Sequence, residues 1–398
     1  MIKKKIDVGS DFSGVGAFDY AIKRIFKDVN TVFACDMDKF ARESYIHNHG
    51  EPGYYPFDVY EREIPKKSLD IYMTSPPCQS FSLAGKRKGK NDLRGVLFFN
   101  SHEFIQKNKP RFFIFENVKG LLSDNGGQTF NEWITLLGGK SVNGTGVIFP
   151  HENSVPYHIY HTVLNSKKHG VPQNRERVFI VGIRDDFDNV FTWPKEEHLT
   201  KKLKDILENE VDDKYFLSDK ALKYLMSDSK SMSANTLQEN EYTRTLMASD
   251  YKSPLTVKIK SNTKKGYENA TENDSINFSN PNSETRRGLV GKEVAQTLDT
   301  GCNQGICIPV LTPDRPNKRQ NGCRFKENND PSFTLTAQDK HGIYDGYKIR
   351  RLTPRECFRL QDFPDTHELV CSDSQSYKQA GNSIRVRVLE LIIRKLKF

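Results

Sequence analysis

The stretch IDVGSDFSGVGAFDYAIKRIF, residues 6–26, joins an apolar run to a helical pattern through a glycine-rich turn. Residues 5–12 (KIDVGSDF) are predicted to form a strand, and residues 18–26 a helix. The apolar face of that helix follows the three-to-four-residue spacing of helical positions: Phe18, Ala21, Ile22, Ile25 and Phe26. The glycines of FSGVG (12–16) allow a tight turn and a close approach of a ligand to the backbone.

The same alternation continues through the first half of the chain. Apolar runs rich in Val, Ile, Phe and Tyr predict further strands at residues 31–36, 69–75, 111–117, 158–165 and 177–183. Helical patterns occupy residues 94–106, ahead of Pro110, and residues 386–396 near the end. Strands that alternate with helices predict an α/β fold with a doubly wound, mostly parallel sheet.

The composition changes after Trp193-Pro194, which predicts a second, smaller domain. Residues 227–287 are dense in Ser, Asn, Thr, Lys and Glu, and apolar runs are few. Three segments nevertheless share a Thr-Leu pair within a polar frame: TRTLMAS (243–249), AQTLDTG (295–301) and FTLTAQD (333–339). We therefore expect an irregular, strand-rich domain, and a length of 398 residues fits one large and one smaller domain.

The overall charge favours a polyanionic partner, because 60 Lys and Arg against 51 Asp and Glu give a net charge of +9. Seven cysteines without a CxxC pair do not suggest a disulfide framework, so we expect a cytoplasmic protein.

No segment approaches the roughly 20 apolar residues of a membrane span. Cys302, Cys307, Cys323 and His341 match no common zinc spacing, so no metal is expected.

A lone cysteine follows the apolar run LDIYM (69–73), in TSPPCQSFSLAG (74–85). Pro76 and Pro77 end the strand and hold Cys78 in a defined loop. Glu116 ends a later strand at the same carboxyl edge of the sheet, while Arg175 and Arg177, two residues apart, point to one side of an extended chain. Singly, these residues fit a helix cap and a solvated charge pair. Together they supply a nucleophile, an acid and two cations.

With these residues in place, the chain strongly resembles the DNA (cytosine-5)-methyltransferase family of bacterial and phage type. The resemblance covers nearly all of residues 6–192 and 347–398, in the family's motif order: FSGVG (12–16), ACDMD (34–38), FDV (57–59), SPPCQSFS (75–82), LRGVLFF (93–99), ENV (116–118), QNRER (173–177), RRLTPREC (350–357) and YKQAGNSI (377–384). Two departures stand out. The family commonly has Asp-Leu-Phe where this chain has Ser10-Asp11-Phe12, and usually Glu where it has Asp36.

The resemblance implies a mechanism and a cofactor, S-adenosylmethionine. Cys78 would add as a thiolate to carbon 6 of cytosine, and Glu116 would protonate ring nitrogen 3. Arg177 would hold the carbonyl oxygen of the base, and Arg175 would position the thiolate loop. By the same resemblance the cofactor pocket consists of Phe12, Gly14, Gly16, Asp36, Met37, Asp58, Pro76, Leu97, Asn382 and Ser383.

The implied substrate is double-stranded DNA with the target cytosine flipped out of the helix. Residues 1–192, completed by 365–398, would form the catalytic domain, residues 193–346 the target-recognition domain, and residues 347–364 a hinge. Candidate DNA contacts are Gln79, Ser82, Thr297, Leu298, Thr334, Leu335 and Arg351, and the choice between the two Thr-Leu pairs stays open. We expect a monomer, with a cognate restriction endonuclease as a conceivable partner.

Three rival functions are weighed against this one. A cytosine methyltransferase of the same fold acting on transfer RNA typically has PPCQPFT and a Cys-Phe-Thr signature, whereas this chain has PPCQSFS (76–82) and no Cys-Phe-Thr. A non-catalytic DNA-binding homologue predicts loss of the nucleophile or the acid, yet Cys78 and Glu116 are present. An amino-group methyltransferase would need an aromatic residue in place of Cys78. The sequence therefore favours a DNA cytosine methyltransferase.

Overall fold

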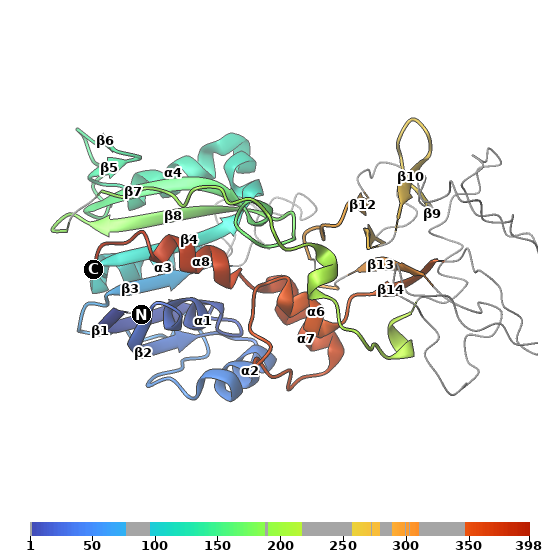
Figure 1. Cartoon of the computed structure of the whole chain (residues 1–398). Coiled ribbons are helices and arrows are strands. Elements are labelled where there is room, and N and C mark those ends of the chain that lie inside the picture. Colours follow the sequence, from blue (N-terminus) through green and yellow to red (C-terminus); the bar gives the residue numbers. More distant parts are fainter. Residues whose placement is uncertain are drawn as a thin grey trace, which may run out of the picture. The chain divides into compact units, whose positions relative to one another are not determined.

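The computed structural model describes residues 2–76, 96–187, 190–216, 257–271, 273–278, 289–298, 300–301, 303–309 and 347–398. The chain divides into two compact units (Figure 1). We call Met1–Thr200 together with Phe358–Phe398 the sheet unit, and Lys201–Cys357 the small unit. Each unit is described by itself.

The sheet unit contains one eight-stranded sheet. Its strands are β1 (Ile2–Asp11), β2 (Phe26–Cys35), β3 (Ile71–Thr74), β4 (Phe112–Val118), β5 (Ser141–Val142), β6 (Thr145–Gly146), β7 (Tyr157–Asn165) and β8 (Glu176–Arg184). Their order is β2-β1-β3-β4-β8-β7-β5-β6. The first four run parallel to one another, whereas β8 is antiparallel to both β4 and β7. The predicted α/β fold with a mostly parallel sheet is confirmed. The sequence did not predict that β8 runs antiparallel to its two neighbours.

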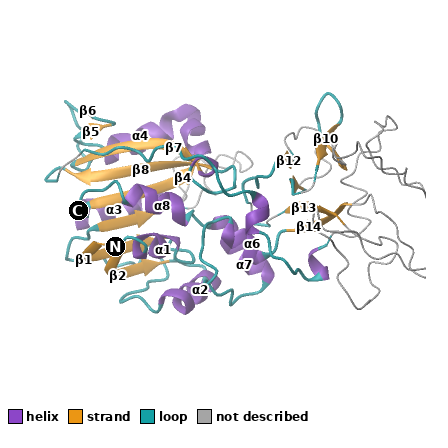
Figure 2. Ribbon diagram, in the orientation of Figure 1, coloured by secondary structure: helices purple, strands orange, loops and turns teal. Residues whose placement is uncertain are grey.

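Helices accompany the strands, as the ribbon in Figure 2 shows. They are α1 (Ala17–Lys23), α2 (Lys39–His49), α3 (Val96–Asn108), α4 (Gln128–Leu137), α7 (Asp373–Asn382) and α8 (Val386–Ile393), with 3-10 turns η2 (Lys119–Gly127) and η3 (Ser166–Lys168). Asp38 begins α2 by accepting hydrogen bonds from the backbone of Phe40 and Ala41. Contacts join α1 to α8 and α3 to α4.

The first helix is shorter than predicted. It ends at Lys23 instead of Phe26, because Phe26 already pairs with Ile2 as the first residue of β2. The sheet pairing outweighs the helical periodicity of Ile25 and Phe26, both of which are still buried. The last helix likewise ends at Ile393 rather than Leu396.

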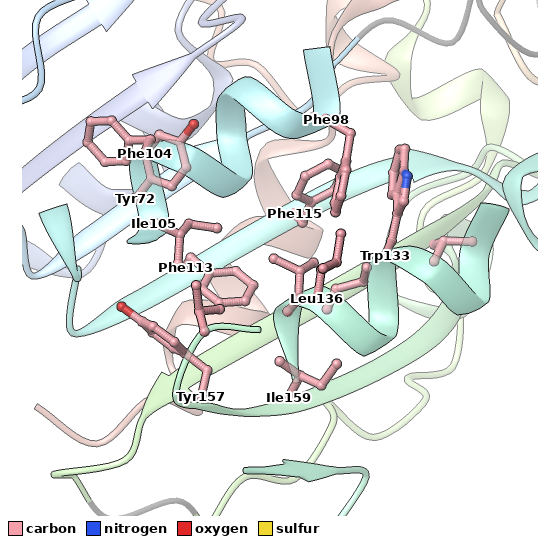
Figure 3. Close-up of a cluster of buried hydrophobic side chains, with 14 of the residues drawn as sticks. Tyr72, Phe98, Phe104, Ile105, Phe113, Phe115, Trp133, Leu136, Tyr157 and Ile159 are labelled. Atoms are coloured by element: carbon pink, nitrogen blue, oxygen red, sulfur yellow. The ribbon is translucent and has the colours of Figure 1, made fainter. Parts of the chain in front are cut away.

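Aromatic packing forms the core on one face of the sheet (Figure 3). Phe98 of α3 stacks on Trp133 of α4 with ring centroids 4.3 Å apart. From β4, Phe113 and Phe115 reach the same cluster. Because successive strand residues face opposite sides of a sheet, Glu116 lies on the other face, which packs against α8. The core thus decides where the carboxyl of Glu116 points.

The small unit is strand-rich, as expected. Its elements are η4 (Leu203–Ile206), η5 (Asp213–Tyr215), β9 (Val257–Lys260), β10 (Tyr267–Ala270), β11 (Ser275–Asn277), β12 (Val290–Gly291), β13 (Gln304–Pro309) and β14 (Tyr347–Arg351); α6 (Pro354–Arg359) crosses its boundary. Strands β9 and β10 form a hairpin, and the others pair antiparallel in the order β12-β11-β13-β14. The buried side chains of Arg350 and Glu356 form a bidentate ion pair, 2.7 and 2.8 Å between N and O atoms.

The Thr-Leu pattern of AQTLDTG (295–301) suggests a short strand, but Thr297 and Leu298 do not form one. Thr297 and Leu298 lie in irregular backbone between β12 and β13. The side chain of Gln304 donates hydrogen bonds to the carbonyl oxygens of Gln296 and Thr297, so a side chain takes the place of a neighbouring strand. The other two Thr-Leu segments, 243–249 and 333–339, lie outside the described residues.

Candidate active site

The polar motifs gather at one edge of the sheet unit. FSGVG follows β1, Asp36 follows β2, Pro76 follows β3, and Glu116 lies near the end of β4. These four strands are parallel, so their carboxyl ends meet at the same edge. Ligands of open α/β sheets bind at this edge.

The turn after β1 holds Phe12 and Gly14 in left-handed backbone, with φ of 56° and 55°. The backbone N–H of Gly14 donates to Oδ2 of Asp36 at 2.8 Å, and the N–H of Asp38 donates to Oδ1 at 2.8 Å. A Cβ added to Gly14 would meet no atom of the described residues within 4 Å, so these residues leave the space over this turn open. Loss of water around the carboxylate raises the pKa of Asp36, and the two backbone N–H groups oppose that rise.

Arg42 of α2 joins Asp36 to the segment before Asp58. Its guanidinium donates to the carbonyl oxygens of Asp36 at 3.1 Å and Pro56 at 2.9 Å. Met37, next to Asp36, is 66% exposed, and Asp58 is half-buried with Oδ1 accepting from the N–H of Tyr60. An aromatic side chain, an open glycine turn and two carboxylates with free lone pairs fit a nucleoside, whose ring stacks and whose hydroxyl and amino groups donate.

A second pocket lies on the α8 face of the sheet. Glu116 is buried, and its Oε1 lies 3.1 Å from Nε of Arg177. The geometry of this ion pair is not that of a hydrogen bond, and Oε1 accepts none from the described residues. Burial raises the pKa of Glu116, while the positive charges of Arg177 and Arg175 act against that rise. The lining residues are Glu116, Leu164, Ser166, Arg175, Arg177, Phe179, Ile384, Arg385 and Val388.

The reversal of β8 puts the arginines beside the glutamate. Strand β8 begins where β4 ends, with Arg177 paired opposite Val118 and Phe179 opposite Glu116. Arg175 is also buried and donates from Nη1 to the carbonyl of Gly381 at 3.2 Å and from Nη2 to that of Ser383 at 3.1 Å. It therefore connects the pocket to the segment that contains Asn382 and Ser383.

The sequence model of C-5 cytosine-specific DNA methylases matches residues 6–398. The chain belongs to this family. It is 36% identical to the orphan methyltransferase M.SPRI of Bacillus phage SPR, covering 98% of this chain and 97% of that protein. It is 30% identical to the type II methyltransferase M.HhaI of Haemophilus parahaemolyticus, covering 96% and 91% of the two chains.

The fold of this DNA methylase also resembles solved structures. The S. pombe Dnmt2 methyltransferase matches with a TM-score of 0.56 and 17% identity, covering 98% of this chain and 97% of that chain. The Entamoeba histolytica methyltransferase EhMeth matches with a TM-score of 0.56 and 17% identity, covering 99% and 98%. At this identity, the likeness concerns the fold alone. The resemblance to a cytosine-5 methyltransferase is confirmed, and the DNA methylase is an enzyme of this kind.

Several predicted site residues lie outside the described part of the chain: Cys78, Gln79, Ser82, Thr334 and Leu335. Of the remaining ones, Leu97 is half-buried in α3, Asn382 is exposed and Ser383 is buried. The carbonyl of Pro76 accepts from the side chain of Asn117 at 3.4 Å, which ties the end of β3 to β4. Gly16 has φ of 82° and faces the ring of His49.

The candidate DNA contacts of the small unit differ in exposure. Thr297 is exposed, whereas Leu298 is 2% exposed and packs inside the unit. Arg351 is half-buried and donates from Nη2 to the carbonyl of Gly301. Of the Thr-Leu pair at 297–298, Thr297 is thus the residue whose side chain is exposed.

Neither a metal site nor a membrane-spanning helix is found among the described residues. These residues contain no group of His, Cys, Asp and Glu that could hold a metal ion. The cysteines and histidine considered for zinc, at 302, 307, 323 and 341, have no described side chains. Within the described ranges, no helix is long and apolar enough to cross a membrane.

The sequence interpretation missed Arg385, which caps α8 and lines the pocket beside Glu116. A signal was available. Arg385 stands four residues before Leu389 and seven before Ile392, in the same stripe as these buried apolar residues. A charged residue within an apolar helical stripe indicates a special environment.

Proposed function

We propose that this DNA methylase transfers a methyl group from S-adenosylmethionine to carbon 5 of a cytosine flipped out of duplex DNA, through a covalent Cys78 adduct. One observation carries the proposal: a buried glutamate, Glu116, faces two arginines at the sheet edge where the Ser75-Pro76-Pro77-Cys78 loop begins. Family membership and the phage and bacterial methyltransferases that match the chain support it.

Carbon 5 of cytosine is a poor nucleophile, so the ring must first be activated. The Cys78 thiolate forms a bond to carbon 6, and the electron pair displaced from the 5,6 double bond makes carbon 5 nucleophilic. Glu116 gives a proton to ring nitrogen 3, which favours this addition. The raised pKa of Glu116 suits that role, because the carboxyl holds its proton closer to neutral pH than an ordinary glutamate does.

The two arginines divide the remaining tasks. Arg177, whose Nε lies 3.1 Å from the glutamate, holds the carbonyl oxygen of the base. Arg175 holds the backbone carbonyls of Gly381 and Ser383, so its role is to position the Asn382-Ser383 segment as well as to stabilise negative charge. After methyl transfer, loss of the carbon 5 proton restores the double bond and releases the thiolate.

When bound, S-adenosylmethionine supplies an electrophilic methyl group. Phe12 would stack on the adenine, Asp36 would accept from the ribose hydroxyls, and Asp58 would accept from the adenine amino group. The remaining pocket residues are Gly14, Gly16, Met37, Pro76, Leu97, Asn382 and Ser383. The open space over Gly14 and the lone pairs left on Asp36 support this assignment.

Sequence-specific DNA contacts come from residues 193–346. A duplex hides carbon 6, so the base must leave the stack before Cys78 can reach it. The excess of Lys and Arg supplies salt-dependent phosphate binding, and a few side chains read base edges in the major groove. Thr297 is a candidate for such a contact, because its side chain is exposed.

Mechanism-based trapping tests the function. A fluorine at carbon 5 cannot leave as a cation, so DNA with 5-fluorocytosine at the target site retains the Cys78 adduct after methyl transfer. With S-adenosylmethionine present, we expect a denaturation-resistant protein-DNA complex. Cys78→Ser abolishes activity and trapping, because serine is far harder to ionise near neutral pH than cysteine.

The half-buried Cys371 provides a matched control, and Cys371→Ser is expected to trap normally. Trapping by the Cys78→Ser variant would falsify the proposed nucleophile. Methylation of transfer RNA without methylation of DNA would instead identify the rival enzyme class. A chain that binds DNA but transfers no methyl group to either nucleic acid would be the non-catalytic homologue.

A further inference from the structure

Arg385 is a buried cation whose hydrogen bonds are unmet. The residue is 3% exposed and lies at the N-terminal cap of α8. Within the described part of the chain, Nε and Nη2 of Arg385 have no hydrogen-bond partner. A buried guanidinium without partners costs free energy, so its presence calls for a physical explanation.

The charges around Arg385 are those of two other arginines and two carboxyls. Arg175, Arg177 and Glu116 line the same pocket as Arg385, and Asp362 also acts on its charge. Asp362 is already engaged, because its Oδ2 lies 2.5 Å from Nη1 of Arg24. Glu116 therefore remains as the carboxyl that Arg175, Arg177 and Arg385 share.

The neighbouring arginines have structural duties that Arg385 lacks. Arg175 donates to the carbonyls of Gly381 and Ser383, and Arg177 donates from Nη1 to the carbonyl of Glu176 at 2.8 Å. A guanidinium that only filled space in the core would be expected to donate to carbonyls in the same way. Since Nε and Nη2 of Arg385 donate to no described group, the effect of this residue on the pocket comes from its positive charge.

We propose that Arg385 is a positioning residue for Glu116: its buried guanidinium, with Nε and Nη2 unbonded among the described residues, sets the pH at which Glu116 holds the proton given to the base. The inference rests on the acid role proposed for Glu116. It adds to the reaction a residue that touches neither the base nor the cofactor.

The direction of the effect follows from the charges. Burial raises the pKa of Glu116, and the positive charges of Arg177, Arg175 and Arg385 hold it below the value that burial alone would give. These are the charged groups that face Glu116 from β8, the loop before it and α8. Removal of Arg385 raises the pKa of Glu116 further. Methyl transfer requires protonated Glu116, so activity is lost as the pH rises through that pKa, and the loss moves to higher pH.

Three variants separate charge from structure. Arg385→Met removes the charge and keeps an unbranched chain, and Arg385→Lys keeps a charge. Arg387→Met is the matched control, because Arg387 lies on the same helix and pairs outside the pocket with Glu197 and Glu390 at 3.3 and 3.4 Å. Single-turnover methyl transfer is measured between about pH 6 and 10 for each protein.

We expect the alkaline limb of the Arg385→Met profile to move upward by on the order of one pH unit. The Arg385→Lys and Arg387→Met profiles should follow the wild type. An unchanged Arg385→Met profile would overturn the proposal. If Arg385→Met does not fold, Arg385→Gln enters the same comparison and decides it by the same criterion.

Thermal unfolding without DNA or cofactor gives a second readout. Arg385→Met should raise the unfolding midpoint, because it removes a buried charge that Arg175 and Arg177 repel, while Arg387→Met should not. A lowered midpoint in Arg385→Met would show that the guanidinium has a stabilising partner, and would overturn the proposal. Absence of methyl transfer by the wild type would count against the proposed function, and the unfolding comparison would still test Arg385.

Discussion

Asp11 and Arg62 form an ion pair in the interior of the sheet unit, with Oδ1 of Asp11 2.8 Å from Nε of Arg62. Both side chains are almost fully buried, and the hydroxyl of Tyr72 donates to Oδ2 of Asp11 at 2.5 Å. The guanidinium carbon of Arg62 lies 4.6 Å from the ring centre of Phe104. By the resemblance to the family, Leu is common at the position of Asp11, so this chain has a charged residue where an apolar one is expected.

This pair gives the first prediction. Asp11→Leu should destabilise the fold by about 3–5 kcal/mol, because it leaves Arg62 buried without its counter-charge. The double variant Asp11→Leu with Arg62→Met should recover most of that loss. Burial raises the pKa of Asp11 despite the charge of Arg62, which indicates that the cost of burying the carboxylate exceeds its attraction to the guanidinium. Urea unfolding of the four proteins in the cycle measures both effects. Additive losses in the double variant would show that the two charges do not interact.

Arg175→Lys should weaken S-adenosylmethionine binding and methyl transfer together. A lysine amine keeps the charge but cannot hold the carbonyls of Gly381 and Ser383 in the two-pronged way of a guanidinium. We expect a loss of roughly 10- to 100-fold in transfer efficiency, the value of one or two buried charged hydrogen bonds. Calorimetry and single-turnover assays measure the two effects. Arg359→Lys, at a partly exposed pair with Asp365, is the control. Unchanged cofactor affinity would show that Arg175 does not position the Asn382-Ser383 segment for cofactor binding.

Glu116→Gln should slow methyl transfer by ~100-fold to 10,000-fold, because a neutral amide cannot deliver a proton to the base. Cofactor affinity should stay at the wild-type value, since Glu116 lies in the pocket on the α8 face and not in the turn after β1. Rapid-quench kinetics and calorimetry provide the two measurements. Wild-type turnover by this variant would show that Glu116 does not protonate the base.

Asp58→Ala should weaken S-adenosylmethionine binding by roughly 10-fold, as expected for one lost hydrogen bond to the adenine. DNA affinity should change little. The exposed neighbour Glu61 offers a control, and Glu61→Ala should bind the cofactor normally. Equal affinities of the Asp58 and Glu61 variants, measured by calorimetry, would place Asp58 outside the pocket.

Replacing residues 193–346 with the matching segment of a relative of different specificity should redirect methylation to the new site. The catalytic motifs lie outside this segment, so the chemistry should persist in a folded chimera. Methylation mapping by long-read sequencing identifies the modified sequence. An active chimera that still methylates the original site would contradict the assignment of recognition to this segment.

The sequence predicted the features that depend on local pattern. The parallel strands β1 to β4 follow from apolar runs, and the carboxyl-edge position of Glu116 follows from their direction. The spacing of Arg175 and Arg177 predicted a common side, and both arginines line one pocket. These outcomes need no knowledge of distant contacts.

Other features depend on contacts between segments far apart in the chain. The early end of α1 at Lys23 reflects the pairing of Phe26 with Ile2 in the neighbouring strand. The interior position of Asp11 depends on Arg62, 51 residues later. No periodicity in the sequence encodes such partners.

The discontinuous sheet unit has a consequence for synthesis of the chain on the ribosome. Residues 1–200 emerge first, but Arg24 must wait for Asp362, and Arg175 for Gly381 and Ser383. Arg385, too, is translated after the small unit. A nascent chain that has not yet reached residue 385 therefore lacks part of the pocket, and methylating activity has to wait until the ribosome has passed the small unit and reached the second segment of the sheet unit.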